Sequence, residues 1–350
     1  MKLAIIGTGK IVHEALPVIA ATDGIAVRSI FARAHSLDKA EALAQRFAIP
    51  VVTTDYASLL ADPQVDTVYI ALINSVHYAY ALQALQADKH VILEKPACMS
   101  YRELQALADE ARSRHLMLFE AVTLLHLPAF HLLQTELLPQ LGTIRHVECN
   151  YSQRSSRYDA YLRGEVLPAF DPAVGGGALM DINIYNLHFV LALLGPPQSA
   201  RYFCRRGFNG VDLSGTVFLE YNTQLSSGAR LSPLRESGEM ACPCSGMSGT
   251  RLCLCTGPKD TDVHSFAPLQ CDIVWLRIEG PVSTMTSITL CLRGQQPQQI
   301  PVPPVAHRLA PEFAAFASIL HHQDFATMNH LLHHSLAVMQ TVDELSTSKT

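Results

Sequence analysis

Polar residues that could bind a nucleotide and move a proton fall in five short stretches, the first being Gly7-Thr8-Gly9-Lys10-Ile11-Val12. This stretch follows an apolar run and precedes a helix-like segment. Gly7 would allow a tight turn, Gly9 would let the backbone approach a pyrophosphate, and the start of the helix would offer N–H donors. Val12 replaces the third glycine of the dinucleotide-binding fingerprint, so the match is partial, and an ordinary strand-to-helix turn is the alternative.

The second and third stretches also follow apolar runs. Arg33 comes just after the run 26–31, where a dinucleotide-binding fold places an acid for the ribose 2′-hydroxyl or an arginine for a 2′-phosphate. Because a guanidinium matches phosphate geometry, we expect NADP in preference to NAD, the alternative being a solvated arginine at a strand end. Asn74 and His77 follow the run 67–72 and would face the cofactor, although Asn74 could simply cap the next helix.

The fourth and fifth stretches contain candidate catalytic groups. Glu94-Lys95-Pro96 ends another apolar run, so its ammonium would lie at the sheet edge where open α/β sheets bind ligands; a solvated loop lysine is the alternative. Gly175-Gly176-Gly177 precedes a helical pattern in which Asp181, Tyr185 and His188, at i, i+4 and i+7, share one face. That face holds no Lys, Arg or Glu, which favours a site over a solvated surface; internally bonded polar groups of an interdomain helix are the alternative.

The elements that must position these residues change character along the chain. Up to residue 121, short apolar runs alternate with amphipathic segments, which predicts an α/β Rossmann domain with a doubly wound parallel sheet over 1–121. The expected strands are 3–6, 26–31, 67–72, 90–93 and 116–119, and the expected helices are 36–47, 78–87 and 101–114.

Residues 122–350 are predicted to form an α+β domain with a large, mostly antiparallel sheet, because runs of strand-like segments follow one another without intervening helices. The expected strands are 144–151, 199–205, 214–221, 251–256, 273–279 and 284–292, and the expected helices are 127–138, 178–194, 311–321 and 327–345. Residues 224–250, rich in Ser, Gly, Cys and Pro, have no clear period and predict an irregular insertion.

Composition bounds the function classes. The 350 residues suggest two domains, and the net charge of −5 argues against a nucleic-acid partner. No run approaches the ~18–20 uninterrupted apolar residues of a membrane helix. The apolar run near the N-terminus is too short for that of a signal peptide, so we expect a cytoplasmic protein with free thiols. The C-x-C pairs at 242–244 and 253–255 and the histidines of the C-terminal tail lack the usual zinc-ligand spacing, so no metal is expected.

Taken together, Gly7-Thr8-Gly9, Glu94-Lys95-Pro96 and Gly175-Gly176-Gly177-x-x-x-Asp181-x-x-x-Tyr185 resemble the Gfo/Idh/MocA family of glucose–fructose oxidoreductase and inositol dehydrogenase. The resemblance covers residues 1–221 and resumes over 253–284. Ser156-Arg157-Tyr158-Asp159 is similar to the dihydrodiol dehydrogenase subgroup.

The resemblance implies an NAD(P)-dependent oxidoreductase that transfers a hydride between nicotinamide and a hydroxyl-bearing carbon of a sugar, polyol or dihydrodiol. The alternative is a non-catalytic NAD(P)-binding sensor with the same fold. The residues implied to bind the cofactor are Gly7, Thr8, Gly9, Lys10, Ile11, Arg33, Leu72, Asn74, His77, Glu94 and Lys95. The residues implied to act in catalysis are Lys95, Asp181 and Tyr185.

Two features leave alternatives open. Many members of the family carry histidine where this chain has Tyr185, so either Lys95 or Tyr185 could carry the proton. The family often associates through the large sheet of its second domain, which implies a homo-oligomer, a dimer or a tetramer. The 224–250 stretch falls between strands of that sheet and has no recognisable counterpart in the family.

Overall fold

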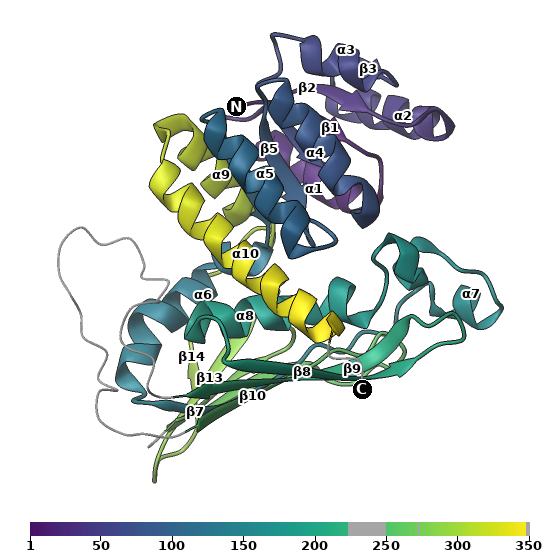
Figure 1. Ribbon diagram of the computed structural model, residues 1–350. Helices are drawn as coiled ribbons and strands as arrows, with labels where there is room; N and C mark the ends of the chain where they lie inside the picture. Colours follow the sequence, from purple (N-terminus) through teal and green to yellow (C-terminus); the bar gives the residue numbers. More distant parts are fainter. Residues whose placement is uncertain (223–249, 272–273, 348–350) are drawn as a thin grey trace. The chain divides into compact units, whose positions relative to one another are not determined.

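The computed structural model describes residues 1–222, 250–271 and 274–347. The chain forms two compact units (Figure 1). Unit 1 comprises Met1–Thr123 and Val305–Leu336, and unit 2 comprises Leu124–Pro304 and Ala337–Thr350. The predicted irregular segment 224–250 lies outside the described residues, apart from Thr250, which begins a strand.

A six-stranded parallel sheet forms the centre of unit 1, in the order β3-β2-β1-β4-β5-β6, which confirms the predicted doubly wound sheet. The order reverses between β1 and β4, the point at which ligands bind beyond the carboxyl ends of such strands. The strands are β1 (Lys2–Ile6), β2 (Ala26–Phe31), β3 (Val51–Thr53), β4 (Thr67–Ile70), β5 (His90–Glu94) and β6 (Leu118–Ala121).

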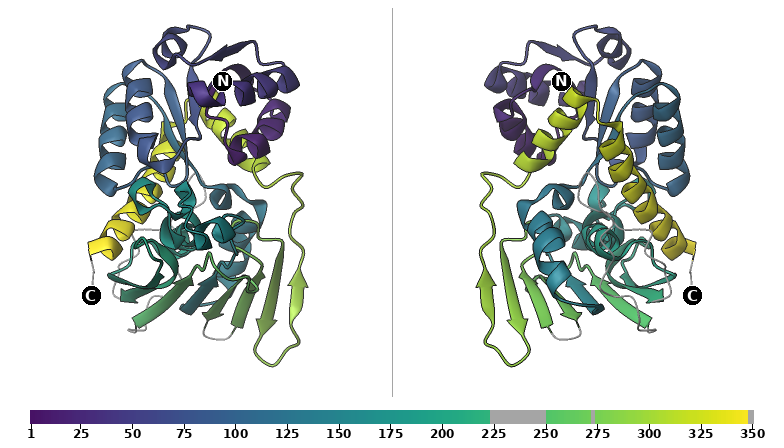
Figure 2. Two further views of the ribbon diagram at one scale, coloured as in Figure 1. Left: turned by 90° about the vertical axis from the view of Figure 1, so that its right-hand side faces the viewer. Right: turned by 90° about the vertical axis from the view of Figure 1, so that its left-hand side faces the viewer.

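Helices cover both faces of this sheet, with α1, α2 and α9 on one face and α4 and α5 on the other (Figure 2). Helix α9 is fixed by aromatic contacts, because the ring of Phe313 lies 5.4 Å from that of Tyr69 and the ring of Phe316 lies 4.8 Å from that of Phe119. The helices are α1 (Lys10–Ala21), α2 (Leu37–Phe47), α3 (Tyr56–Ala61), α4 (His77–Gln86), α5 (Tyr101–Ser113), α9 (Ala310–His322) and α10 (Phe325–Thr347), which continues into unit 2.

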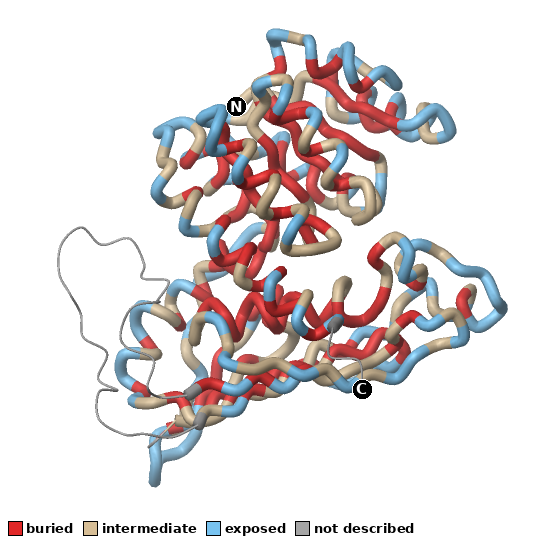
Figure 3. Tube along the Cα trace, in the orientation of Figure 1, coloured by how far each residue is buried: buried red, intermediate tan, exposed pale blue. Residues whose placement is uncertain are grey.

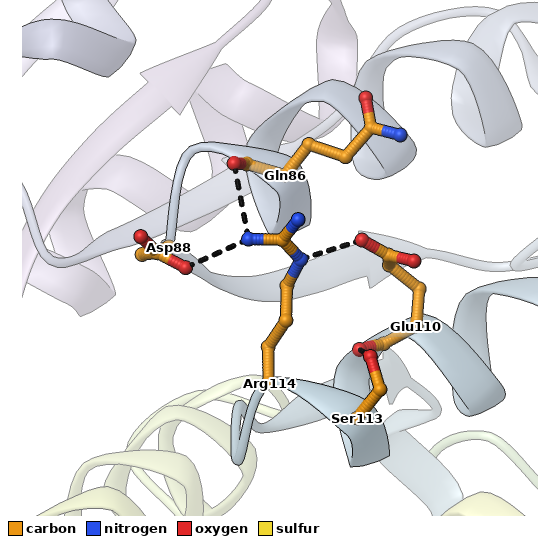
Figure 4. Close-up of polar contacts among 5 residues, drawn as sticks. All are labelled: Gln86, Asp88, Glu110, Ser113 and Arg114. Atoms are coloured by element: carbon orange, nitrogen blue, oxygen red, sulfur yellow. Dashed lines mark hydrogen bonds and ion pairs between the residues drawn. The ribbon is translucent and has the colours of Figure 1, made fainter.

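The end of α5 is tied to the turn between α4 and β5 by Arg114 (Figure 4). Its guanidinium donates to Glu110 at 2.5 Å, to Asp88 at 3.0 Å and to the carbonyl oxygen of Gln86 at 3.3 Å. These contacts join residues on both sides of β5, the strand that leads to Lys95. Because exposed ion pairs contribute little to stability, we assign them a role in local geometry only.

Unit 2 contains an eight-stranded sheet in the order β14-β13-β12-β11-β7-β10-β9-β8. Among the described strands, all neighbours are antiparallel except β7 and β10, which confirms the predicted mostly antiparallel sheet. The strands are β7 (Ile144–Asn150), β8 (Ser199–Arg206), β9 (Asp212–Asn222), β10 (Thr250–Thr256), β11 (Phe266–Cys271), β12 (Val274–Glu279), β13 (Ser287–Leu292) and β14 (Gln298–Ile300).

Short helices lie over one face of the unit 2 sheet, and Figure 3 shows buried residues interspersed with more accessible ones along its strands. They are α6 (Pro128–Leu132), α7 (Tyr158–Leu162) and α8 (Ile184–Leu194), with single π-helical turns at η4 (Leu133–Leu137) and η8 (Leu179–Asn183). The stretch Pro172–Leu194 is long and apolar enough to cross a membrane, but 78% of an 18-residue apolar window within it is buried inside the protein, as expected of a core helix.

Some elements differ from those expected. The predicted continuous helix 178–194 begins with the π-helical turn η8, and the predicted helix 127–138 divides into α6, η4 and a 3₁₀ turn. Strands β3, β11 and β14 and helix α3 were not predicted. β11 contains Pro268, which cannot donate to a sheet and argues against a strand in sequence; it lies at a position where no pairing with β7 is made.

Candidate functional site

The turn between β1 and α1 is shaped by Gly7. Its φ is +125°, and a Cβ at this position would lie 2.5 Å from the carbonyl oxygen of Ala71, so only glycine fits. The Gly7 N–H donates to the carbonyl oxygen of Phe31 at 2.9 Å, so the turn lies against the ends of both β2 and β4. Gly9 is exposed and caps α1 with extended backbone and no side-chain bond, which leaves the first N–H groups of α1 for an anion.

The other residues predicted to bind the phosphates lie beside this turn. Lys10 is exposed and Ile11 is half-buried in the first turn of α1, and Thr8 is half-buried before it. Arg33 is exposed and follows β2 with extended backbone, at the start of a 3₁₀ turn. The structure therefore brings a guanidinium to the end of the strand next to β1, as a 2′-phosphate site requires.

The loop after β4 is joined to the Lys95 turn by His77. The imidazole Nδ1 lies 3.0 Å from the carbonyl oxygen of Pro96, which follows Lys95 through a cis peptide bond, and Nε2 lies 3.1 Å from the carbonyl oxygen of Leu72. His77 is fully buried, and burial lowers its pKa although the two carbonyl oxygens oppose the shift. Asn74 is half-buried and begins the 3₁₀ turn before α4. His77 thus fixes both loops through their backbone.

The Lys95 turn is held on its inner side by two carboxyl groups. Glu94 accepts hydrogen bonds from the Tyr69 hydroxyl at 2.5 Å and from the Lys95 N–H at 3.2 Å. Glu120 accepts a hydrogen bond from the Ala97 N–H at 2.8 Å. Lys95 itself is half-buried just beyond the carboxyl end of β5. The position of its Cα is therefore set by contacts that involve neither solvent nor a ligand.

The carboxyl groups near Lys95 are shifted toward the neutral acid. Burial raises the pKa of Glu120 to about 7, and it also raises the pKa of Glu94 and of Glu312 on α9. Lys95 and Arg308 lower the pKa of Glu94, but burial outweighs them. Burial therefore favours the neutral form of three carboxyl groups in unit 1, two of which bind the backbone of the Lys95 turn.

In unit 2, Asp181 lies in the π-helical turn η8, just before α8. Its side chain is 41% exposed, whereas Tyr185 is 8% exposed and His188 is 1% exposed. The Tyr185 ring lies 5.8 Å from the ring of Tyr151. The helical spacing predicts one shared face, but the π turn alters that spacing, and among these three side chains the structure leaves Asp181 the most accessible.

Sequence reasoning missed Lys259, which follows β10. Its Nζ lies 2.8 Å from the Asp181 carboxylate, donates to the carbonyl oxygen of Ala169 at 2.7 Å and lies 4.7 Å from the centre of the Phe170 ring. The lysine side chain is only 1% exposed. The one signal in sequence is a lysine in the turn Gly257-Pro258-Lys259-Asp260, which is typical of a solvated loop. The structure instead shows a buried ammonium beneath a candidate site carboxylate.

The carboxylate of Asp212 explains why the last residue of the Gly175-Gly176-Gly177 run must be glycine. A Cβ on Gly177, whose φ is +126°, would overlap the Asp212 carboxylate. That carboxylate accepts hydrogen bonds from the Leu179 N–H at 2.7 Å and from the Tyr202 hydroxyl at 2.6 Å. Burial raises the pKa of Asp212, and its hydrogen bond to Tyr202 opposes the shift. Gly177 therefore makes room for a buried protein carboxyl that fixes the start of η8.

No group of three or more His, Cys, Asp and Glu side chains in the described part of the chain is arranged to hold a metal ion. Cys253 and Cys255 are buried in β10, and Cys255 lies opposite Cys149 of β7. The pair Cys242 and Cys244 lies outside the described residues.

Two family models match the chain. Residues 1–122 match the oxidoreductase family with an NAD-binding Rossmann fold, GFO/IDH/MocA, and residues 139–240 match a C-terminal domain of the same family. The chain is also 32% identical over 222 residues to scyllo-inositol 2-dehydrogenase (NADP⁺) IolU of Bacillus subtilis, covering 63% of this chain and 67% of that protein. The chain belongs to the Gfo/Idh/MocA family. The predicted family is thereby confirmed.

Other members of the Gfo/Idh/MocA family show similar matches. The chain is 34% identical to the uncharacterized oxidoreductase YgjR of Escherichia coli, over 63% of this chain and 66% of that protein. It is 31% identical to human trans-1,2-dihydrobenzene-1,2-diol dehydrogenase, over 60% of this chain and 65% of that protein. The matches thus span about two thirds of the length of these relatives.

Solved structures share the fold of both units. The structure of KijD10, a 3-ketoreductase from Actinomadura kijaniata in complex with NADP, superposes with a TM-score of 0.76 at 22% identity, over 99% of this chain and 96% of that chain. UDP-N-acetylglucosamine 3-dehydrogenase GnnA from Acidithiobacillus ferrooxidans superposes with a TM-score of 0.73 at 18% identity, over 98% of both chains. At this identity the likeness concerns the fold alone.

Proposed function

We propose that the chain is an NADP-dependent oxidoreductase that transfers a hydride between nicotinamide and a hydroxyl-bearing carbon of a sugar, polyol or dihydrodiol. The observation that carries the proposal is the carboxyl edge of the unit 1 sheet, where the Gly7 turn and Lys95 follow β1 and β5 of a 3-2-1-4-5-6 sheet. Relatives named for inositol and dihydrodiol substrates support the substrate class.

The residues present at this edge fit a dinucleotide. Gly7 lets the β1–α1 turn approach the end of β4, and the uncapped start of α1 offers N–H donors to a pyrophosphate. Thr8, Gly9, Lys10 and Ile11 would line this anion site. Arg33 would bind the 2′-phosphate, and Leu72, Asn74 and Glu94 would lie by the nicotinamide half, where His77 would act through the two loops that it joins.

The bound cofactor supplies the hydride chemistry. During oxidation the hydroxyl proton passes either to Lys95, which then starts as the neutral amine, or to Tyr185, which then starts as the phenolate while the Lys95 ammonium donates a hydrogen bond to the reacting oxygen. Reduction returns the proton from the same group. Asp181 accepts a hydrogen bond from the substrate and orients it. Glu94, Glu120 and His77 fix the backbone of the Lys95 turn, so the starting point of the lysine side chain is set before any ligand binds.

Initial rates with NADP⁺ and NADPH on a panel of inositols, aldoses and dihydrodiols, and on their ketones, test the proposal. We expect turnover with at least one neutral polyhydroxylated compound. Tight NADPH binding, seen as a change in fluorescence, without turnover on any compound would instead favour the non-catalytic sensor. Absence of both binding and turnover would contradict both functions.

The cofactor preference depends on Arg33. We expect NADPH to bind more tightly than NADH, and Arg33→Ala to weaken NADPH binding by about 10–100-fold while leaving NADH binding nearly unchanged, because a hydrogen bond to a charged group contributes roughly 1.5–3 kcal/mol. Fluorescence titration measures both dissociation constants, and Arg46→Ala, on the neighbouring helix α2, is the control. Equal affinities in the unaltered protein would contradict the choice of NADP.

We further propose a cytoplasmic homo-oligomer, a dimer or tetramer, with no nucleic-acid or membrane partner. Free cysteines among the described residues suit a reducing compartment. The sheet of unit 2 exposes several large apolar side chains, which supports association through that sheet. They are Phe203, Phe218, Leu252, Trp275 and Leu292. Sedimentation velocity would measure the assembly.

A further inference from the structure

Beneath the candidate substrate-binding carboxylate of unit 2 lies a buried cation that the reaction proposed above does not use. We propose that Lys259 is a positioning residue, which keeps the Asp181 carboxylate ionised and in one orientation so that it can accept a hydrogen bond from a substrate hydroxyl. This inference rests on the proposed function of Asp181.

The first observation is the difference in solvent exposure between the Lys259 and Asp181 side chains. The Lys259 side chain is 1% exposed and the Asp181 side chain is 41% exposed, while their charged atoms lie 2.8 Å apart. The pair therefore runs from the interior to the surface, and a ligand would meet the carboxylate and not the ammonium. A cation placed in this way acts on a ligand through its partner.

The lysine is also held independently of Asp181. Its Nζ donates to the carbonyl oxygen of Ala169 at 2.7 Å and lies over the face of the Phe170 ring, at 4.7 Å from its centre. Its backbone N–H donates to the carbonyl oxygen of Leu213 at 2.8 Å. Because these contacts fix the ammonium before any substrate binds, the carboxylate has a fixed partner toward which it is drawn.

Neighbouring titratable groups have donors of their own. Asp212 of β9 accepts hydrogen bonds from the Tyr202 hydroxyl of β8 and from the Leu179 N–H, and Lys259 contributes only the last of the effects on its pKa. Asp260, the residue after Lys259, pairs with Arg205 of β8. The direct contact of the Lys259 ammonium with a carboxylate is therefore the contact with Asp181.

The test compares the pH dependence of kcat/KM in the unaltered protein, Lys259→Met and Lys259→Arg at saturating NADP⁺. Because a nearby cation favours the carboxylate over the carboxylic acid, we expect Lys259→Met to move the acidic limb upward by about 1–3 pH units. Lys259→Arg keeps the positive charge, so its acidic limb should lie at the same pH as that of the unaltered protein. NADPH affinity should stay unchanged in both variants, and Lys39→Met, an exposed lysine of unit 1, is the control.

A double-mutant comparison separates positioning from a purely structural role. In an Asp181→Asn background, Lys259→Met should lower kcat/KM no further, since there is no carboxylate left to position. Equal losses in the two backgrounds, or an acidic limb unmoved by Lys259→Met, would overturn the proposal. If Lys259→Met does not fold, Lys259→Gln, which keeps a donor for Ala169, replaces it in the same comparison.

The two inferences fail in different ways. Lack of turnover in the unaltered protein contradicts the proposed function alone. In that case the coupling between Lys259 and Asp181 is measured in thermal unfolding of the two single variants and the double variant, and strictly additive effects would overturn the inference by themselves.

Discussion

The Lys95 turn of unit 1 and the Asp181 turn of unit 2 handle charge in opposite ways. At the first, Lys95 is half-buried in a turn whose backbone N–H groups donate to the carboxyl groups of Glu94 and Glu120. At the second, a carboxylate that is 41% exposed lies above the buried ammonium of Lys259. In both units a candidate site residue is thus supported from the interior by groups of the opposite acid–base type.

The two turns differ in how their buried ionisable groups are stabilised. Burial raises the pKa of Glu94, Glu120 and Glu312, so unit 1 favours protonation of its interior acids. In unit 2 the buried Lys259 has a carboxylate at 2.8 Å, a carbonyl oxygen and an aromatic ring around it. At the Lys95 turn, burial thus favours the neutral form of the carboxyl groups, whereas at the Asp181 turn the buried ammonium is paired with a carboxylate.

The largest effect is expected at Lys95. Lys95→Met should reduce kcat by about 10²–10⁴-fold, the usual range for the loss of a positioned acid or base, because it removes the proposed hydrogen-bond donor to the reacting oxygen. NADPH affinity, measured by fluorescence titration, should change by only a few fold. The matched control is Lys39→Met on α2, where the lysine is exposed and kcat should not change.

Near-normal turnover in Lys95→Met with cofactor bound would contradict the catalytic role of Lys95. The carboxyl groups that bind the Lys95 turn would then hold no catalytic residue in place. A loss in kcat of the same size in Tyr185→Phe would instead show that the proton transfer involves both residues.

Much of the fold follows from local patterns. The runs at 3–6, 26–31 and 90–93 became β1, β2 and β5 because parallel strands covered on both faces are mostly apolar, although β2 also contains Arg28 and Ser29. Strands such as β11 could not be predicted, since the pairing of its neighbours with β7 and β12 overrides the local effect of Pro268. Nor does helical periodicity show that residues 305–336 pack in unit 1.

The candidate site was predictable where one residue type is demanded by backbone geometry. Gly7 has a positive φ and no room for a Cβ, so its role could be anticipated from its place after a strand. Lys259 could not be found in this way, because its partners Asp181 and Ala169 lie far from it in sequence and only the folded sheet brings them together. The sequence predicted His77 as a candidate site residue, but it did not predict that His77 joins two loops.

The next largest effect is expected on the stability of the protein, through the buried carboxyl group of Glu120 in unit 1. The pKa of Glu120 is about 7 in the folded protein and near 4.5 when unfolded, so the fold binds an extra proton between these values. The contribution of this proton to the free energy of unfolding is fully present below pH 4.5 and is lost as the pH rises through 7. Glu120→Gln, which keeps an acceptor for Ala97, should therefore be more stable than the unaltered protein at pH 8, by about 3 kcal/mol.

Urea unfolding between pH 4 and 8 measures this difference, which should grow from pH 4.5 and level off above pH 7. The control is Glu41→Gln on α2, an exposed glutamate that should show no such pH dependence. A difference that stays constant with pH would show that Glu120 does not hold a proton at neutral pH, and unit 1 would then resemble unit 2.

The smallest effect tests whether the aromatic ring stabilises the buried charge of unit 2. Phe170→Leu removes the ring that lies 4.7 Å from Lys259 Nζ, whereas Phe189→Leu removes an equally buried ring that packs on Phe130 at 6.0 Å. Both rings are fully buried, and Phe170→Leu should be the more destabilising in urea unfolding, by about 1–2 kcal/mol, the contribution of a desolvated cation–π contact. In a Lys259→Met background the excess should vanish, because no cation is left for the ring to stabilise. An excess that persists there would assign it to packing of Phe170 against Tyr161, and the carboxylate of Asp181 would then be the main compensation for the lysine charge.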